Sequence, residues 1–114
     1  KVWSERESSM QIYKDEVSIS GPYGLTIPFA EMDSIVLLEK IPKIRLRLNG
    51  ISTSSVSKGK FKGAGQSRYH LLLDKPYKQA VIIYRSKDIP VIISLDQVEE
   101  EELYISLKEK LEAL

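Results

Sequence analysis

Few residues in this sequence of 114 could carry catalytic chemistry. His70 is its single histidine, and an ordinary pKa of about 6.5 would suit a general base. It lies in the middle of a predicted strand, and the nearest acidic residue in the sequence is Asp74. The serines between positions 52 and 57 gather in a predicted loop and lack the strand-to-helix elbow that exposes a nucleophile. Because nucleophile and base are not paired, the sequence predicts that the chain is not an enzyme.

Neither a metal centre nor a bound cofactor is expected. The chain has no cysteine, which excludes a thiolate zinc site, and one histidine leaves little basis for an imidazole site. The four glutamates at 99–102 diverge around a predicted helix, where the helix dipole explains them better than a hard metal does. The glycines between 59 and 65 precede a strand, whereas a phosphate loop leads into a helix. We interpret them as turn or bulge residues.

The clearest charge signal is a basic segment from Lys40 to Leu73, which holds eight cations and no carboxylate although the net charge is only +1. On a predicted strand, alternate cations share one face at spacings of about 6.6 Å. The candidate binding surface comprises Lys43, Arg45, Arg47, Lys58, Lys60, Lys62 and Arg68.

Three interpretations of this basic segment stay open. It could be a solvated strand face whose charges protect a sheet edge. It could bind anionic lipid, each cation contributing about 1 kcal/mol. It could also bind a protein or another polyanion. One short basic segment falls below the usual electrostatic footprint of nucleic-acid binding, so no nucleic-acid partner is expected.

Short runs of alternating polar and apolar residues predict the strands that would position these cations. Residues 17–20 and 25–29 flank a turn at 21–24 and predict a hairpin. Residues 43–49 alternate throughout, which predicts a strand with Ile44, Leu46 and Leu48 buried on one face. Further strands are predicted at 34–39, 67–73, 80–85 and 91–95, with a short one at 60–62.

The period changes to that of a helix only at the C-terminus. A stripe of leucines predicts an amphipathic helix at about residues 96–113, formed by Leu103, Leu107, Leu111 and Leu114. Asp96 is its predicted N-cap, with Glu99 as the capping-box partner. The expected fold is mainly β, with about seven antiparallel strands in a half-open barrel or sandwich that the helix closes.

Several segments, taken in register, resemble bacterial pleckstrin-homology (PH)-like domains. Residues 21–35, GPYGLTIPFAEMDSI, are similar to their opening hairpin, in which G-x-x-G-x-x-I-P leads into an acidic turn and an isoleucine. The segments IRLRLNG at 44–50, GKFK at 59–62 and YHLLL at 69–73 also fit, and the similarity covers roughly residues 15–112. The resemblance implies a PH-like fold at residues 10–114, preceded by a loose arm at 1–9.

The resemblance also implies a location and a kind of partner. Members of this type often follow two transmembrane helices, so we expect the domain at the cytoplasmic face of the cell membrane, or else in the cytoplasm. No apolar run here reaches the roughly 20 residues that span a bilayer, and the start at Lys1 without Met suggests an upstream segment. Eukaryotic PH domains bind phosphoinositides through basic residues around the first hairpin, which this chain lacks at 20–24.

The sequence therefore predicts a non-catalytic binding or assembly module. Its expected partner is a protein or a second copy of the chain. Contact with an anionic membrane through the basic strand face is the alternative.

Overall fold

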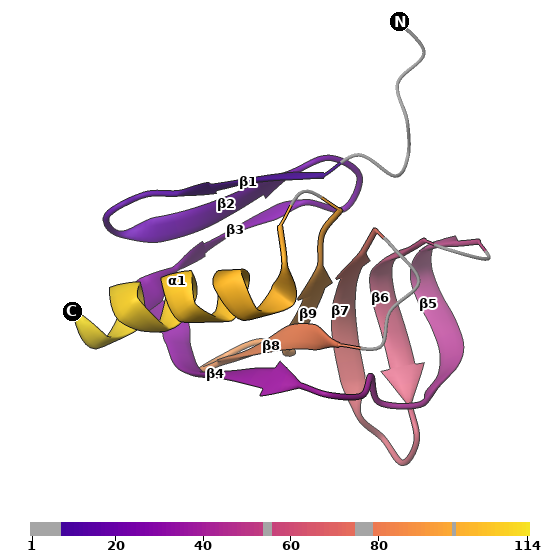
Figure 1. The fold of residues 1–114 in the computed structure, drawn as a ribbon. Helices are drawn as coiled ribbons and strands as arrows, with labels where there is room; N and C mark the ends of the chain where they lie inside the picture. The colour runs from indigo at the N-terminus through magenta and orange to yellow at the C-terminus, as the bar shows by residue number, and fades with distance from the viewer. Residues whose placement is uncertain (1–7, 54–55, 75–78, 97) are drawn as a thin grey trace, which may run out of the picture.

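Two β-sheets and one C-terminal helix make up the part of the chain that the computed structural model describes, residues 8–53, 56–74, 79–96 and 98–114 (Figure 1). The three-stranded sheet is an antiparallel meander of β1 (Ser9–Ile12), β2 (Glu16–Ser20) and β3 (Leu25–Pro28). A single turn of 3₁₀ helix, η1 (Phe29–Glu31), leads from it into the second sheet.

The second sheet has six strands in the spatial order β4-β8-β9-β7-β6-β5. Its strands are β4 (Met32–Leu38), β5 (Ile44–Ser52), β6 (Ser57–Gly63), β7 (Arg68–Leu73), β8 (Ala80–Arg85) and β9 (Val91–Ser94). All neighbours are antiparallel except β7 and β9, which run parallel. The order places β4 and β5 at opposite edges although they are consecutive in the chain.

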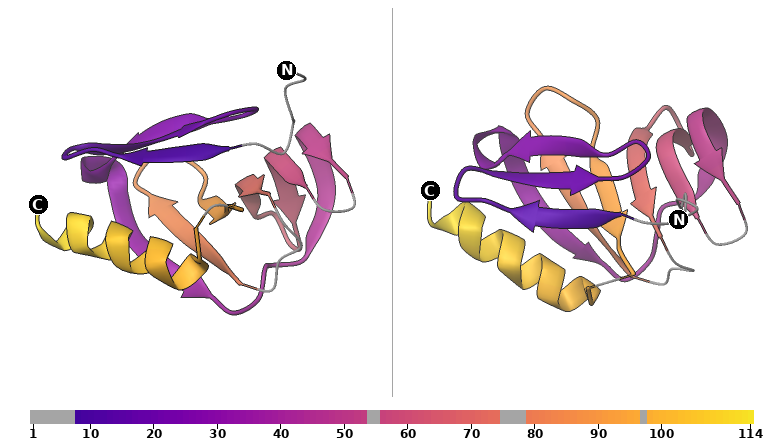
Figure 2. Two further views of the ribbon diagram at one scale, coloured as in Figure 1. Left: turned by 45° about the horizontal axis from the view of Figure 1, so that its top comes forward. Right: turned by 90° about the horizontal axis from the view of Figure 1, so that it is seen from above.

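The main hydrophobic core lies between the two sheets and is closed at one side by α1 (Glu100–Glu112). Figure 2 shows the three-stranded sheet lying over one part of the larger sheet, with β5 and β6 extending beyond it. A second, smaller core that includes Phe61, Leu71 and Ile82 forms on the other face of the larger sheet. Strands β8 and β9 and the end of β7 are therefore buried on both faces, which explains their nearly continuous apolar runs.

The predicted hairpin is confirmed, with β2 and β3 joined by a turn at residues 21–24. Gly21 has a φ of 104° and Tyr23 a φ of 58°, and the Gly24 amide donates a hydrogen bond to the Gly21 carbonyl. A Cβ at Gly24 would clash with the carbonyl oxygen of Ile19, so this turn requires glycine there.

The C-terminal helix is confirmed, but its predicted start at residue 96 is wrong. The helix begins at Glu100, and its N-cap is Glu99 in extended conformation, without a side-chain capping bond. The Glu100 side chain turns inward, where the Ser94 hydroxyl donates a 2.9 Å hydrogen bond to its Oε1. This buried contact helps fix the first turn. Leu103 and Leu107 are buried as predicted, whereas Leu114 lies beyond the helix and is 68% exposed.

The mainly β architecture with a C-terminal helix is thus confirmed, while the strand count and the barrel are not. The described residues form nine strands rather than about seven, and the two sheets do not close into a barrel. One extra strand, β1, begins at Ser9, and Ser8 is buried, so these two residues of the predicted arm are part of the fold; residues 1–7 lie outside the described ranges. Within the described residues, no helix has the length and apolarity to cross a bilayer.

Candidate functional site

Strand β5 forms one edge of the six-stranded sheet and is the longest of the described strands, at nine residues. It pairs with β6 on one side, and no described strand pairs with its other side. Gly59 in β6 lies directly opposite Gly50 in β5, with a φ of +119°. A Cβ at Gly59 would clash with the backbone of Asn49 and Gly50, so the close pairing of β5 with β6 depends on this glycine.

The prediction that Leu46 and Leu48 are buried is wrong. Leu46 is 54% exposed and Leu48 is 41% exposed, and only Ile44 packs against a core. Strand β5 lies beyond the part of the sheet that the small sheet covers, and α1 packs on β4, β8 and η1 (Figure 1). The pairing also shifts twice, between Ile44 and Leu46 and between Arg47 and Asn49, so strict alternation is lost.

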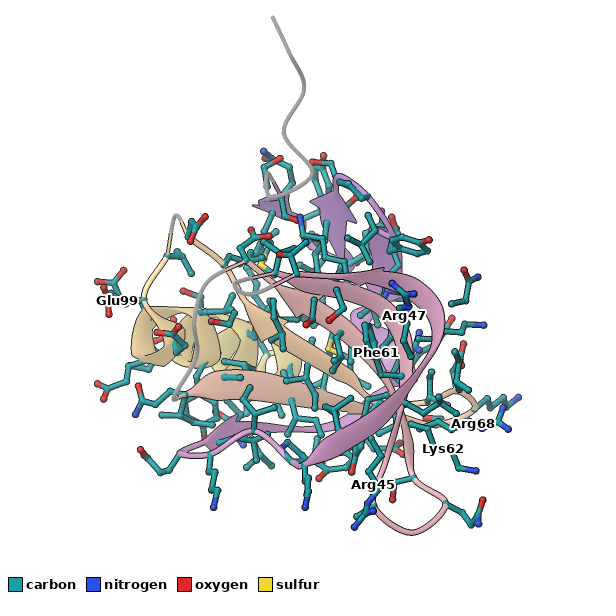
Figure 3. All side chains as sticks on the ribbon, turned by 90° about the vertical axis from the view of Figure 1, so that its right-hand side faces the viewer. Arg45, Arg47, Phe61, Lys62, Arg68 and Glu99 are labelled. Carbon is teal, nitrogen blue, oxygen red and sulfur yellow. The ribbon has the colours of Figure 1, made fainter. Side chains whose placement is uncertain are left out.

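The seven predicted cations do not form one stripe. Arg47 pairs with Phe61, whereas Lys62 pairs with Arg68 across the neighbouring strands, as Figure 3 shows. Because Phe61 and Lys62 are consecutive in β6, they point to opposite faces of the sheet. The cations of this region therefore lie on both faces of the sheet, in or next to β5, β6 and β7: Lys43, Arg45, Arg47, Lys60 and Arg68 are exposed, and Lys62 is half-buried.

Lys58 has a different environment from the other six cations. Its side chain is 0% exposed, and its Nζ lies 2.8 Å from Oδ1 of Asp74, which is 1% exposed. The same Nζ donates a 2.7 Å hydrogen bond to the Ser8 hydroxyl. Burial raises the pKa of the Asp74 carboxyl above its usual value, although the nearby Lys58 ammonium opposes the shift. Lys58 is thus an interior residue whose partner, Asp74, sequence reasoning missed.

His70 links the two sheets. Its Nε2 is 2.7 Å from the carbonyl oxygen of Tyr23 in the turn of the small sheet. Because a carbonyl oxygen accepts and does not donate, Nε2 carries the hydrogen. Burial lowers the pKa of the His70 imidazole. Among the described residues, no group of three or more metal-ligating side chains is found.

A groove that the sequence did not reveal lies between β1 and α1. Its cavity volume is about 230 Å³. It is lined by Met10, Ile12, Leu95, Val98, Leu103, Glu102 and Ser106. The lining is mainly apolar because Met10 and Ile12 pair with the core residues Ile19 and Val17 and point to the same face of the small sheet. Since β1 is the edge strand of that sheet, these two side chains lie at the border of the core.

No protein-family model matches this sequence, and comparison with curated proteins and with solved structures gives no significant match. The resemblance to bacterial PH-like domains therefore stays a prediction. A function has to be argued from the surfaces of the domain itself.

Proposed function

We propose that this chain is a non-catalytic protein-binding module that takes up an extended, acidic segment of its partner along the outer edge of β5. The observation that carries the proposal is the nine-residue edge strand β5, whose outer side pairs with no described strand and which carries exposed leucines beside exposed arginines. An added strand binds through main-chain hydrogen bonds, and its alternate side chains determine specificity.

Charge favours an acidic segment over a neutral or basic one. Successive side chains of an added strand point to opposite faces of the sheet. Arg47 lies on one face in β5 itself, and Lys62 lies on the other face in the adjacent strand β6. Acidic side chains on both faces of the added strand would therefore meet cations, while a basic strand would be repelled. Leu46 and Leu48 add apolar contact between the charges.

The irregular pairing of β5 supports selective binding. Register shifts and charged side chains protect an edge strand from pairing with any exposed strand. A partner must match the charges of β5 to overcome this protection.

We also propose a PH-like fold and a location at the cytoplasmic face of the membrane. The mainly β fold and the terminal helix support the proposed fold, and the sequence resemblance supports both the fold and the location.

Contact with anionic lipid is the second candidate function. Its support is a cluster of cations on one face of the larger sheet, where Lys60, Lys62 and Arg68 occupy alternate or paired positions. Such binding would weaken steeply above about 0.15 M salt, since the Debye length falls to about 8 Å there. Strand addition depends on backbone hydrogen bonds and would persist.

The test uses a synthetic peptide as long as β5 that repeats the unit Glu-Glu-Val-Val, which places glutamates on both faces of the added strand. We expect it to bind the wild-type domain and to protect the β5 amides from hydrogen exchange at physiological salt. The Arg45→Glu/Arg47→Glu variant should bind it at least about tenfold more weakly, since attraction becomes repulsion. The control variant Lys87→Glu/Lys110→Glu makes the same change of charge at exposed positions away from β5 and should bind normally.

Two results would contradict the proposal. One is binding that persists when alternate peptide amides are N-methylated, since this modification removes the main-chain donors. The other is equal binding by the Arg45→Glu/Arg47→Glu variant. Co-sedimentation with anionic but not zwitterionic vesicles, lost in that variant and in high salt, would favour the lipid function instead.

A further inference from the structure

The groove between β1 and α1 has the properties that the β5 edge requires of a partner. Its floor and walls are apolar, with Met10 and Ile12 on one side and Leu95, Val98 and Leu103 on the other. Its volume of about 230 Å³ exceeds the engineered cavity of about 150 Å³ that holds a benzene molecule. The groove therefore has room for a leucine side chain.

The rim of the groove is acidic. Glu102 lines it directly, and Glu99 and Glu101 are exposed on the same end of α1. The rim of the groove is thus negatively charged, whereas the β5 edge, where Arg45 and Arg47 flank Leu46, is positively charged. A leucine between two arginines thus matches an apolar slot with carboxylates at its rim.

The two surfaces lie on different sides of the molecule. Figure 3 shows Glu99, at the start of α1, on the side opposite Lys62 and Arg68. The β5 edge therefore cannot reach the groove of the same copy, but it can reach the groove of a second copy. Both surfaces also border edge strands whose outer sides pair with no strand in the described ranges, β5 in the larger sheet and β1 in the smaller one. Exposed edges of this kind are usually covered or otherwise protected.

We infer that copies of this chain assemble head to tail, with Leu46 of one copy inserted in the β1–α1 groove of the next and Leu48 packed beside it. The inference rests on the proposed function, because it names the partner of the same β5 edge: the edge strand β1 of the next copy is the extended segment, and α1 beside it supplies the carboxylates. The contact joins two different surfaces, so each added copy leaves one β5 edge and one groove available. Growth then continues into an open chain or closes into a ring, and it does not stop at a two-fold dimer.

A pair of charge-reversal variants tests this geometry. The edge variant is Arg45→Glu/Arg47→Glu, and the groove variant is Glu102→Lys/Ser106→Lys, with all four positions exposed. In a solution of either variant alone, the edge of one copy and the groove of the next carry charge of the same sign and repel each other. Self-association, measured by sedimentation velocity, should therefore weaken on the order of tenfold. When the two variants are mixed, the acidic edge of the edge variant meets the basic groove of the groove variant. The unchanged basic edge of the groove variant likewise matches the unchanged acidic groove of the edge variant. The mixture should therefore recover assemblies larger than a dimer.

Matched controls separate local contact from net charge and from loss of fold. Glu109→Lys reverses an exposed glutamate two turns further along α1 that neither lines the groove nor belongs to its acidic rim, and it should leave assembly unchanged. Circular dichroism must show that each variant remains folded. Leu46→Ser/Leu48→Ser, which leaves every charge in place, should weaken assembly as well, since it removes the apolar side chains of the contact.

Several results would overturn the inference. They are a wild-type chain that stays monomeric at every concentration, a dimer that does not grow, a mixture that fails to recover assembly, or growth only on anionic vesicles. The acidic peptide decides the proposed function separately. If the peptide binds β5 while the wild-type chain stays monomeric, the inference fails alone; if neither binding nor assembly occurs, both fail.

Discussion

Replacing Lys58 with methionine would measure how much the buried ion pair contributes to stability. The substitution keeps a long apolar stem and removes the ammonium that lies 2.8 Å from Asp74 Oδ1 and 2.7 Å from Ser8 Oγ. Breaking a buried pair by removing one partner typically costs about 3–5 kcal/mol. Because burial already raises the pKa of Asp74, the stranded carboxyl can take up a proton, and we expect about 3 kcal/mol at neutral pH.

A loss of about 3 kcal/mol is a large part of the free energy of unfolding expected for the whole domain. At ~0.05–0.15 kcal/mol per residue, a domain of 114 residues has a free energy of unfolding of ~6–17 kcal/mol. The measurement is urea unfolding followed by circular dichroism. Lys60→Met is the matched control, because Lys60 lies on the same face of β6 but is exposed, and it should change stability by less than about 0.5 kcal/mol.

The cost should also depend on pH in a defined direction. Lys58 lowers the pKa of Asp74, so its removal raises that pKa further above the usual 3.8. Below its folded-state pKa, the folded variant binds a proton that the unfolded chain does not yet bind, so folding is favoured as pH falls towards 3.8. The penalty of Lys58→Met should therefore be smaller at pH values just above 4 than at neutral pH.

A double variant supplies the refutation. Lys58→Met/Asp74→Leu removes both charges and should recover most of the lost stability, since apolar replacement of a buried pair is often neutral or stabilising. The reasoning fails if Lys58→Met costs less than about 1 kcal/mol. It also fails if the penalty is the same at both pH values, or if the double variant is no more stable than the single one.

Three further predictions concern the edge, the link between the sheets and the helix start. Gly59→Ala places a side chain at a φ of +119° against Asn49, so we expect a loss of about 1–3 kcal/mol and loss of peptide binding, measured by amide exchange in β5. The imidazole of His70, the single histidine, should titrate below pH 6.5 in an NMR experiment, and stability should rise with pH between its folded pKa and 6.5; a pKa above 6.5 would contradict this. Ser94→Ala removes a hydrogen-bond donor to the buried Glu100 side chain and should lower the unfolding free energy by about 1.5–3 kcal/mol; an unchanged melting temperature would show that the bond is dispensable.

Local patterns in the sequence were sufficient to predict most elements. Alternation predicted the strands around residues 17–20 and 25–29, and the proline and glycines at 21–24 predicted the hairpin turn. The leucine stripe predicted the helix. These signals are local because side-chain period and turn geometry depend on neighbours in the chain. The helix start was missed because a tertiary contact, between Ser94 and Glu100, draws the first turn inward.

The basic segment was recognised from the sequence, but the environment of each cation was not. Lys58, Lys60 and Lys62 alternate along β6 and share one face, so their spacing predicts equal exposure. In the folded chain, Lys58 is buried beside Asp74, whereas Lys60 is exposed. Their exposure differs because the small sheet, with Ser8 at its border, covers this face of β6 only near Lys58, at the start of the strand.

The sequence alone thus determined the type of each element and the gathering of positive charge, since both depend on residues close together in the chain. Only the tertiary structure decided that β5 is an edge and that Leu46 is exposed. The edge follows from strand order, and that order depends on pairings such as β7 with β9, which join residues about twenty apart. An alternating strand shows which residues share a face, but the layer that covers the face comes from elsewhere in the chain.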